Sequence, residues 1–332
     1  HAFNRYFRRK LMLLSALSAD HIITPTKTMS DMVAQWEPSI LQKCSINPYG
    51  TINEIFTPST RKRNWREDGT VRLLYVSVYY PHKVPNVICR AVQQLIDIGI
   101  DAHATITMSL GEFDEMNGSA LDKAVVTDAH ERGLITLGHH SYEDLPELYG
   151  SHDVFVFPSV SETFGHPMAE ALSSGLPTIV SDTLVNQEIC GDTALYFEPF
   201  SAKRLVEQLQ KLDREPELRK MNSENGRQRA VEKFGWNDHV DRLVETFEIV
   251  PALVVFGGVL LAEIPALVRT DRLGRGAIAG LVAIVPVADA HIGGLARGAV
   301  IAPAGKAPIH ASAFANHVRN LGYRSELEKA RP

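Results

Sequence analysis

Two glutamates, Glu162 and Glu170, are separated by seven residues in a stretch rich in small and apolar side chains. Their carboxylate oxygens could accept hydrogen bonds from hydroxyl groups such as those of a sugar. Between them, Gly165 would let a ligand approach the backbone closely, and Pro167 suits the first position of a helix. A helix start presents N–H groups and the positive end of the helix dipole to an anion. These residues predict a phosphate site flanked by hydroxyl acceptors, which is the chemistry that a nucleotide-sugar requires.

A strand, a loop and a helix must position these groups. Residues 153–157 alternate apolar with β-branched or aromatic side chains and stop at a proline, which is typical of a short buried strand. The loop 159–165 follows. Residues 168–174 have helical spacing and are followed by glycine and proline, which end helices. A second buried strand begins over residues 178–180, so the stretch is predicted to be a βαβ unit whose loop opens onto a helix N-terminus.

Each glutamate also has a purely structural interpretation. A glutamate in the first turn of a helix, as predicted for Glu170, often only complements the helix dipole. A loop glutamate such as Glu162 is usually solvated. On spacing alone the structural interpretation is the simpler one.

The residues on either side of the two glutamates extend the pattern. The additional residues are Phe164-Gly165 between them and the segments 157–159, 170–172, 175–177, 181–182, 188–192 and 194–197. Together they resemble the signature of glycosyltransferase family 4, and the similarity runs roughly over residues 20–248. The resemblance implies a retaining enzyme with the GT-B fold, in which Glu162 contacts the donor sugar and Glu170 the ribose.

A second loop, residues 77–85, carries a lysine after the predicted strand 71–76. The family usually places an arginine and a lysine here to hold the donor diphosphate, and Lys83 matches the lysine, a compact cation that suits a leaving phosphate. The position of the arginine is Val78, which departs from the family. Either His82 or another residue supplies the second charge, or the diphosphate binds more weakly. Taken alone, Lys83 is more simply a solvated loop lysine.

A third loop follows the predicted strand 134–137 and begins Gly138-His139-His140. The resemblance implies that this loop borders the nucleotide base. No carboxylate or cysteine has ligand spacing near the two histidines, and GT-B enzymes generally need no bound metal, so we expect no metal site. The predicted catalytic residues are Lys83 and Glu162, and the predicted nucleotide-sugar-binding residues are His82, Gly138, His139, Phe164, Gly165, His166 and Glu170.

Strands and helices alternate from residue 71 to residue 197, which is the pattern of a parallel sheet covered on both faces. We therefore predict an α/β fold with a GT-B type, Rossmann-like nucleotide-sugar-binding domain at 71–249. Residues 1–58 resemble the end of a truncated second Rossmann-like domain on the acceptor side, and the polar segment 59–70 is predicted to be a linker. The Ala/Gly-rich tail 250–332 does not continue the family's pattern and is left unassigned. Its apolar runs are shorter than the ~17–25 residues of a spanning helix.

Length and composition limit the number of domains, the class of partner and the compartment. A chain of 332 residues allows two domains, and its net charge of −5 argues against a nucleic-acid partner. Three cysteines without a CxxC pair indicate a reducing, cytoplasmic compartment. Residues 1–19 are predicted to form a basic amphipathic helix. This helix either contacts the inner face of an anionic membrane or, as we favour, is a domain helix with a solvated basic edge.

We therefore predict a retaining hexosyltransferase that moves a sugar from a UDP- or GDP-linked donor to a glycan or lipid-linked acceptor in surface polysaccharide synthesis. Mannose from GDP-mannose is one candidate donor sugar, and we expect no cofactor. The alternative is a catalytically incomplete, nucleotide-binding fragment, because the first Gly-rich loop of the acceptor domain is not found in residues 1–60. An NAD-binding Rossmann protein ranks last, since no G-x-G-x-x-G follows the strand 71–76.

Overall fold

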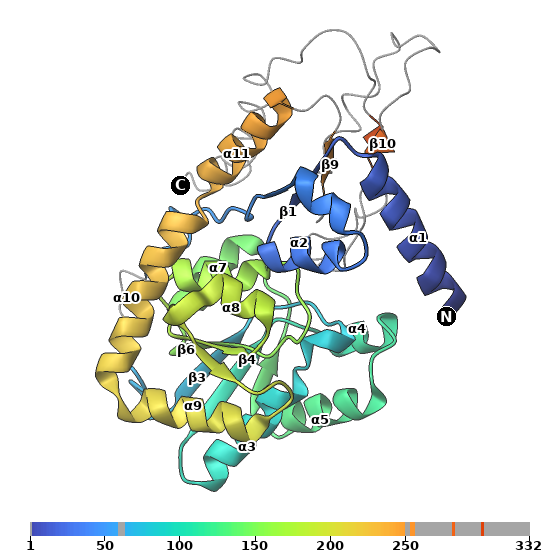
Figure 1. Ribbon diagram of the computed structural model, residues 1–332. Helices are drawn as coiled ribbons and strands as arrows, with labels where there is room; N and C mark the ends of the chain where they lie inside the picture. The colour runs from blue at the N-terminus through green and yellow to red at the C-terminus, as the bar shows by residue number, and fades with distance from the viewer. Residues whose placement is uncertain (1, 59–63, 250–252, 256–280, 283–299, 302–332) are drawn as a thin grey trace. The chain divides into compact units, whose positions relative to one another are not determined.

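The computed structural model describes residues 2–58, 64–249, 253–255, 281–282 and 300–301 (Figure 1). The chain divides into two compact units. One consists of residues 51–235, and the other combines residues 1–50 with residues 236–332. Each unit is described by itself.

A six-stranded parallel sheet forms the centre of residues 51–235, in the order β5-β4-β3-β6-β7-β8. Its strands are β3 (Val71–Tyr75), β4 (Ala102–Ile106), β5 (Ile135–Leu137), β6 (Val154–Phe157), β7 (Thr178–Ser181) and β8 (Leu195–Phe197). The sheet grows from β3 outward to β5, and the chain then returns to place β6 on the other side of β3. The neighbours β3 and β6 therefore form the topological switch point, which is where ligands bind in open α/β sheets.

Helices cover both faces of this sheet, because right-handed crossovers that run in opposite directions from the switch point lie on opposite faces. They are α3 (Asn86–Asp97), α4 (Leu110–Glu115), α5 (Ala120–Glu131), α6 (Leu145–Gly150), α7 (His166–Ser173), α8 (Leu184–Cys190), α9 (Ala202–Arg214) and α10 (Pro216–Lys233). Helix α9 packs against α3, and α10 packs against α7 (Figure 1). Every residue of β6 and β7 is buried, as expected for central parallel strands. The predicted Rossmann-like α/β fold is confirmed.

Helix α4, residues 110–115, is not among the helices that the sequence pattern predicts, although a local signal is present. Ser109 and Glu112 form a capping box, in which the side chain of each residue accepts a hydrogen bond from the backbone N–H group of the other. The Ser-x-x-Glu spacing is the known signature of such a helix start.

The second unit contains α1 (Ala2–Ser18), α2 (Lys27–Ala34), the 3₁₀ helix η1 (Pro38–Lys43) and α11 (Trp236–Ile249). Its three-stranded parallel sheet has the order β2-β1-β9, made by β1 (His21–Thr24), β2 (Cys44–Ile46) and β9 (Leu253–Val255). Two further strands, β10 (Leu281–Val282) and β11 (Val300–Ile301), pair antiparallel. The rest of the tail 250–332 lies outside the described residues.

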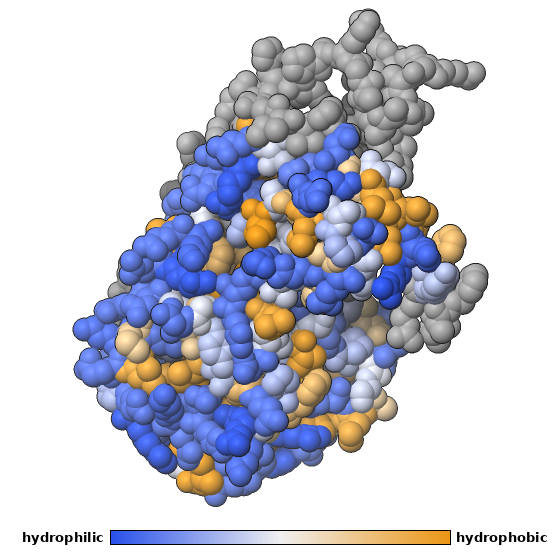
Figure 2. Space-filling model, in the orientation of Figure 1, coloured by the Kyte–Doolittle hydropathy of each residue, from blue (hydrophilic) through white to orange (hydrophobic). Residues whose placement is uncertain are grey.

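Helix α1 confirms the helix predicted over residues 1–19. Ala16 and Ala19 are buried in a small apolar cluster with residues of β1, α2 and η1. The opposite side of α1 is apolar yet exposed, and it carries Tyr6, Phe7, Leu11, Leu14 and Leu17 (Figure 2). In the described part of the chain, no helix combines the length and apolar character needed to cross a bilayer.

The unit boundaries differ from the domain limits that the sequence suggests. Helix α11 groups with residues 1–50, because Nε of Arg242 donates to Oδ1 of Asn47 at 3.0 Å and Nδ1 of His239 lies 2.8 Å from the carbonyl oxygen of Pro48. Burial lowers the pKa of His239 to about 4, so this ring is neutral near pH 7.

Residues 51–58 group instead with the six-stranded sheet. Phe56 is completely buried, and its carbonyl oxygen accepts from Nη1 of Arg227 at 2.7 Å. In the predicted linker, residues 59–63 lie outside the described residues. Farther along, Nε1 of Trp65 donates to Oδ1 of Asp213 at 2.7 Å, so this part of the segment is attached to α9.

Candidate functional site

Lys83 and Glu162 form a buried ion pair at the switch point. Nζ of Lys83 lies 2.7 Å from Oε1 of Glu162, and the two side chains are 6% and 0% exposed. Lys83 ends the 3₁₀ helix η2 (Pro81–Lys83) in the loop after β3, while Glu162 lies in the loop after β6. The fold thus brings together the two residues predicted to be catalytic. Nζ also lies 5.6 Å from the centre of the Phe157 ring.

The two loops are joined through their backbones as well. The amide of Val160 in the second loop donates to the carbonyl oxygen of His82 in the first loop at 3.0 Å. The hydroxyl of Tyr75, at the end of β3, donates to the carbonyl oxygen of Lys83 at 2.8 Å. Val84 turns the chain with a left-handed φ of 47°. The imidazole of His82 stacks on Tyr80, with ring centres 5.7 Å apart. These contacts fix the loop that carries the Lys83 ammonium group.

Helix α7 starts where the sequence places an anion site. It begins at His166, one residue before the predicted Pro167, and Gly165 caps it with a left-handed φ of 82°. Phe164 is fully buried and packs edge-on against Phe234 with ring centres 5.4 Å apart, so its side chain has a packing role. His166 is half-buried and lies beside Phe164.

Glu170 lies on α7 and is buried against α6. The hydroxyl of Tyr149 donates to its Oε2 at 2.8 Å, and the same hydroxyl lies 3.3 Å from the carbonyl oxygen of Pro167. Burial raises the pKa of Glu170 to about 7, although the Tyr149 hydrogen bond opposes that rise. Burial and the neighbouring carboxylate also raise the pKa of Tyr149 well above its ordinary value. The two glutamates of the motif thus have partners on different elements, and no motif or spacing in the sequence points to Tyr149.

His139, in the loop after β5, contacts a carboxylate that the spacing of residues in the sequence does not indicate. Nε2 of His139 lies 2.8 Å from Oε1 of Glu112, which comes from α4. His139 remains 62% exposed, and the space where a Cβ of Gly138 would lie is open. Among the residues that the structure describes, no three side chains of the His, Cys, Asp and Glu types gather as a metal site would require.

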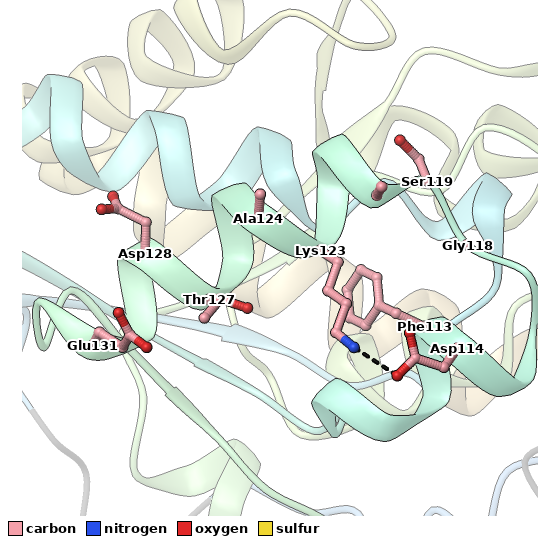
Figure 3. A pocket seen from close by; sticks show the side chains of 10 residues that line it. Phe113, Asp114, Gly118, Ser119, Lys123, Ala124, Thr127, Asp128 and Glu131 are labelled. Atoms are coloured by element: carbon pink, nitrogen blue, oxygen red, sulfur yellow. Dashed lines mark hydrogen bonds and ion pairs between the residues drawn. The ribbon is translucent and has the colours of Figure 1, made fainter.

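A surface hollow of about 490 Å³ lies elsewhere on the same unit, between α4 and α5 (Figure 3). It is lined by Phe113, Asp114, Gly118, Ser119, Ala120, Lys123, Ala124, Thr127, Asp128 and Glu131. Nζ of Lys123 and Oδ2 of Asp114 form an ion pair of 2.6 Å in it. None of the predicted site residues lines this hollow, so we place the candidate site at the strand ends and not here.

Comparison with known proteins finds a family model and curated relatives that match this chain. The family model described as "Glycosyl transferases group 1" matches residues 57–229. The chain is 27% identical over 218 residues to the O-antigen chain mannosyltransferase RfbU of Salmonella typhimurium, a match that covers 64% of this chain and 56% of the relative. It is 30% identical over 169 residues to a GDP-mannose-dependent alpha-mannosyltransferase of Mycobacterium tuberculosis, covering 49% of this chain and 39% of the relative. The chain therefore spans about half of the length of these curated relatives.

Solved structures share the fold. A sucrose-phosphate synthase from Thermosynechococcus elongatus superposes with a TM-score of 0.60 at 21% identity, covering 72% of this chain and 61% of the other. The HepE protein of Anabaena, solved in complex with UDP and glucose, superposes with a TM-score of 0.62 at 15% identity, covering 73% and 68%. At these identities the likeness concerns the fold alone.

Proposed function

The chain belongs to the group 1 glycosyl transferases, and from this premise we propose that residues 51–235 bind a nucleotide-sugar whose sugar the whole protein transfers. The observation that carries the proposal is the buried pair of Lys83 and Glu162 at the switch point, beside the start of α7. Negative charge grows on the diphosphate as the sugar–phosphate bond breaks. A fixed ammonium group and helix N–H groups would stabilise that charge.

The remaining roles follow from this arrangement and from the family 4 resemblance. Glu162 would contact the donor sugar while it holds the Lys83 ammonium group in place. Glu170, held by Tyr149, would accept a hydrogen bond from the ribose. We propose that transfer proceeds with retention, as in family 4, and that no metal takes part.

The relatives' names guide the choice of donor. Because relatives of this chain are named as O-antigen chain mannosyltransferases and as a GDP-mannose-dependent enzyme, we propose GDP-mannose as the donor. The HepE protein was solved with UDP, so UDP-sugars should be tested as well. We propose a glycan or lipid-linked acceptor in surface polysaccharide synthesis. The reaction would take place in the cytoplasm. One side of α1 packs within its unit, as favoured above, and its exposed apolar side would allow peripheral contact at the inner face of the membrane as well.

A second candidate function is nucleotide binding without transfer. The chain spans about half of the length of its curated relatives, which favours this reading for the 332 residues taken alone. Binding and transfer must therefore be measured separately.

Titration calorimetry with GDP, UDP and GDP-mannose tests the binding step. Removing Lys83 alone would take away the cation beside the buried Glu162 carboxylate and could unfold the site. The double variant Lys83→Met, Glu162→Gln keeps the pair neutral and is the better probe. We expect it to weaken binding of GDP by at least about tenfold, since it loses charge-assisted contacts to phosphate.

Lys123→Ala is the matched control, because it removes a lysine from an ion pair in the α4–α5 hollow on the same unit. It should bind as the parent does. Equal affinity of the double variant and the parent for GDP would refute the placement of the diphosphate. Binding by the parent without donor turnover would select the binding-fragment alternative.

A further inference from the structure

One buried carboxylate joins three of the loops at the carboxyl edge of the sheet. Oε2 of Glu112 accepts from the amide of Tyr79 at 2.6 Å, in the loop after β3. Oε1 accepts from the amide of Ser109 at 3.2 Å, in the loop after β4. The same Oε1 lies 2.8 Å from Nε2 of His139, in the loop after β5. Glu112 is itself only 6% exposed.

This geometry indicates which ring nitrogen of His139 carries a proton. An ionised carboxylate has acceptors and no donor, so Nε2 of His139 must carry the proton that points at Glu112. In the neutral ring, Nδ1 is then the acceptor, and it belongs to a side chain that is 62% exposed. Metal-bound histidines are oriented by carboxylates in the same manner, through the ring nitrogen that faces away from the ligand.

Through Tyr79, Glu112 also holds the loop that carries Lys83. The Tyr79 ring is fully buried and stacks on Phe113 with ring centres 3.6 Å apart. A Cβ at Gly118 would lie 2.6 Å from that ring, so only glycine fits there. Tyr79 is therefore fixed by its amide and by its ring, four residues before Lys83. A change at Glu112 would loosen the loop that carries the ammonium group.

We propose that Glu112 is a positioning residue of the donor site: it locks the loop of Lys83 and sets His139 as a hydrogen-bond acceptor toward the ligand. The proposal rests on the proposed function. A nucleobase N–H group is the donor that such an acceptor would select, and both guanine and uracil offer one.

The test compares Glu112→Gln with Asp114→Asn, which changes an exposed carboxylate on the same helix. In Glu112→Gln the amide N–H₂ group must face at least one of the N–H groups that donate to the carboxylate in the parent, so at least one hydrogen bond is lost. We expect about tenfold weaker binding of GDP, which is the size of effect from one lost buried hydrogen bond. The Asp114→Asn variant should bind as the parent does. Unchanged GDP affinity in Glu112→Gln would overturn the proposal.

Two further readouts separate positioning from a purely structural role. Nitrogen-15 NMR of the ligand-free parent should show His139 as the Nε2–H form, and Glu112→Gln should shift that equilibrium. In a double-mutant cycle, the combined loss in Glu112→Gln, His139→Ala should be smaller than the sum of the two single losses, because the two residues share one contact while Glu112 also holds the amide of Tyr79. Fully additive losses, or a parent ring in the Nδ1–H form, would reject the proposal. A parent that binds neither GDP nor UDP would reject the proposed function, whereas the NMR result stands without ligand.

Discussion

Glu170 should make the stability of the six-stranded unit depend on pH. Its folded-state pKa of about 7 lies above the ordinary value of 4.5, because the side chain is buried. A carboxyl whose pKa is raised by folding contributes its full stability below the unfolded pKa and loses it as the pH rises through the folded pKa. The gap between the two values corresponds to about 3 kcal/mol in the free energy of unfolding. The free energy of unfolding of the parent should therefore fall by about 3 kcal/mol between pH 4.5 and pH 7.5 because of Glu170.

The assay compares the parent with Glu170→Gln, which cannot titrate. Trp65 is the single tryptophan of residues 51–235, so replacing Trp36 and Trp236 by phenylalanine leaves a fluorescence probe specific to this unit. Urea unfolding followed at this probe gives the free energy of unfolding at each pH. Groups other than Glu170 titrate in both proteins, so they cancel in the difference between the two pH profiles.

Parallel profiles for the parent and Glu170→Gln would refute the reasoning, because they would mean that Glu170 does not titrate between these pH values. Tyr149→Phe supplies a second check of sign. The Tyr149 hydrogen bond lowers the pKa of Glu170, so its loss should move the stability change to higher pH. A move to lower pH would contradict the assigned contact.

Two further predictions concern positions that hold the site in place. Gly118→Ala should lower the stability by about 1–3 kcal/mol, because its Cβ would overlap the Tyr79 ring. Gly111→Ala is the control, since its Cβ meets nothing closer than 3.7 Å; equal melting temperatures by calorimetry would contradict the prediction. Arg227→Ala removes the donor to the carbonyl oxygen of Phe56. Thermolysin, which cuts before apolar residues such as Ile52, Ile55 and Phe56, should then cut residues 51–58 faster while circular dichroism is unchanged. Equal cleavage rates would show that the bond does not anchor this segment.

The strands and helices of the parallel sheet could be predicted from the sequence because their signals are local. Buried parallel strands give apolar runs, and the helices between them have caps and stops at the expected places. Ser109 and Glu112 carry the capping signal of the helix over residues 110–115, which the predicted helices do not include. The start of α7 at His166 differs by one residue from the expected Pro167. Helix ends are commonly uncertain by that much.

The partners of the site residues could not be predicted, because they come from distant parts of the chain. Glu162 meets a lysine 79 positions earlier. Glu170 meets Tyr149 on another helix. His139, after β5, meets Glu112 on the helix that follows the neighbouring strand β4. No spacing rule connects such pairs. Only the strand order places their loops at one edge, and that order becomes known with the structure.

The switch point also explains why a lysine and a glutamate are buried there together. A buried ion pair adds little net stability, since the loss of hydration offsets most of the attraction. An apolar pair of similar volume would therefore serve folding as well as Lys83 and Glu162 do. Crossovers leave β3 and β6 toward opposite faces, so the strand ends between them are not covered by a connecting helix. Under the proposed function, a charged pair at that edge would keep a cation oriented until an anionic ligand arrives, and this accounts for the position of the pair better than stability does.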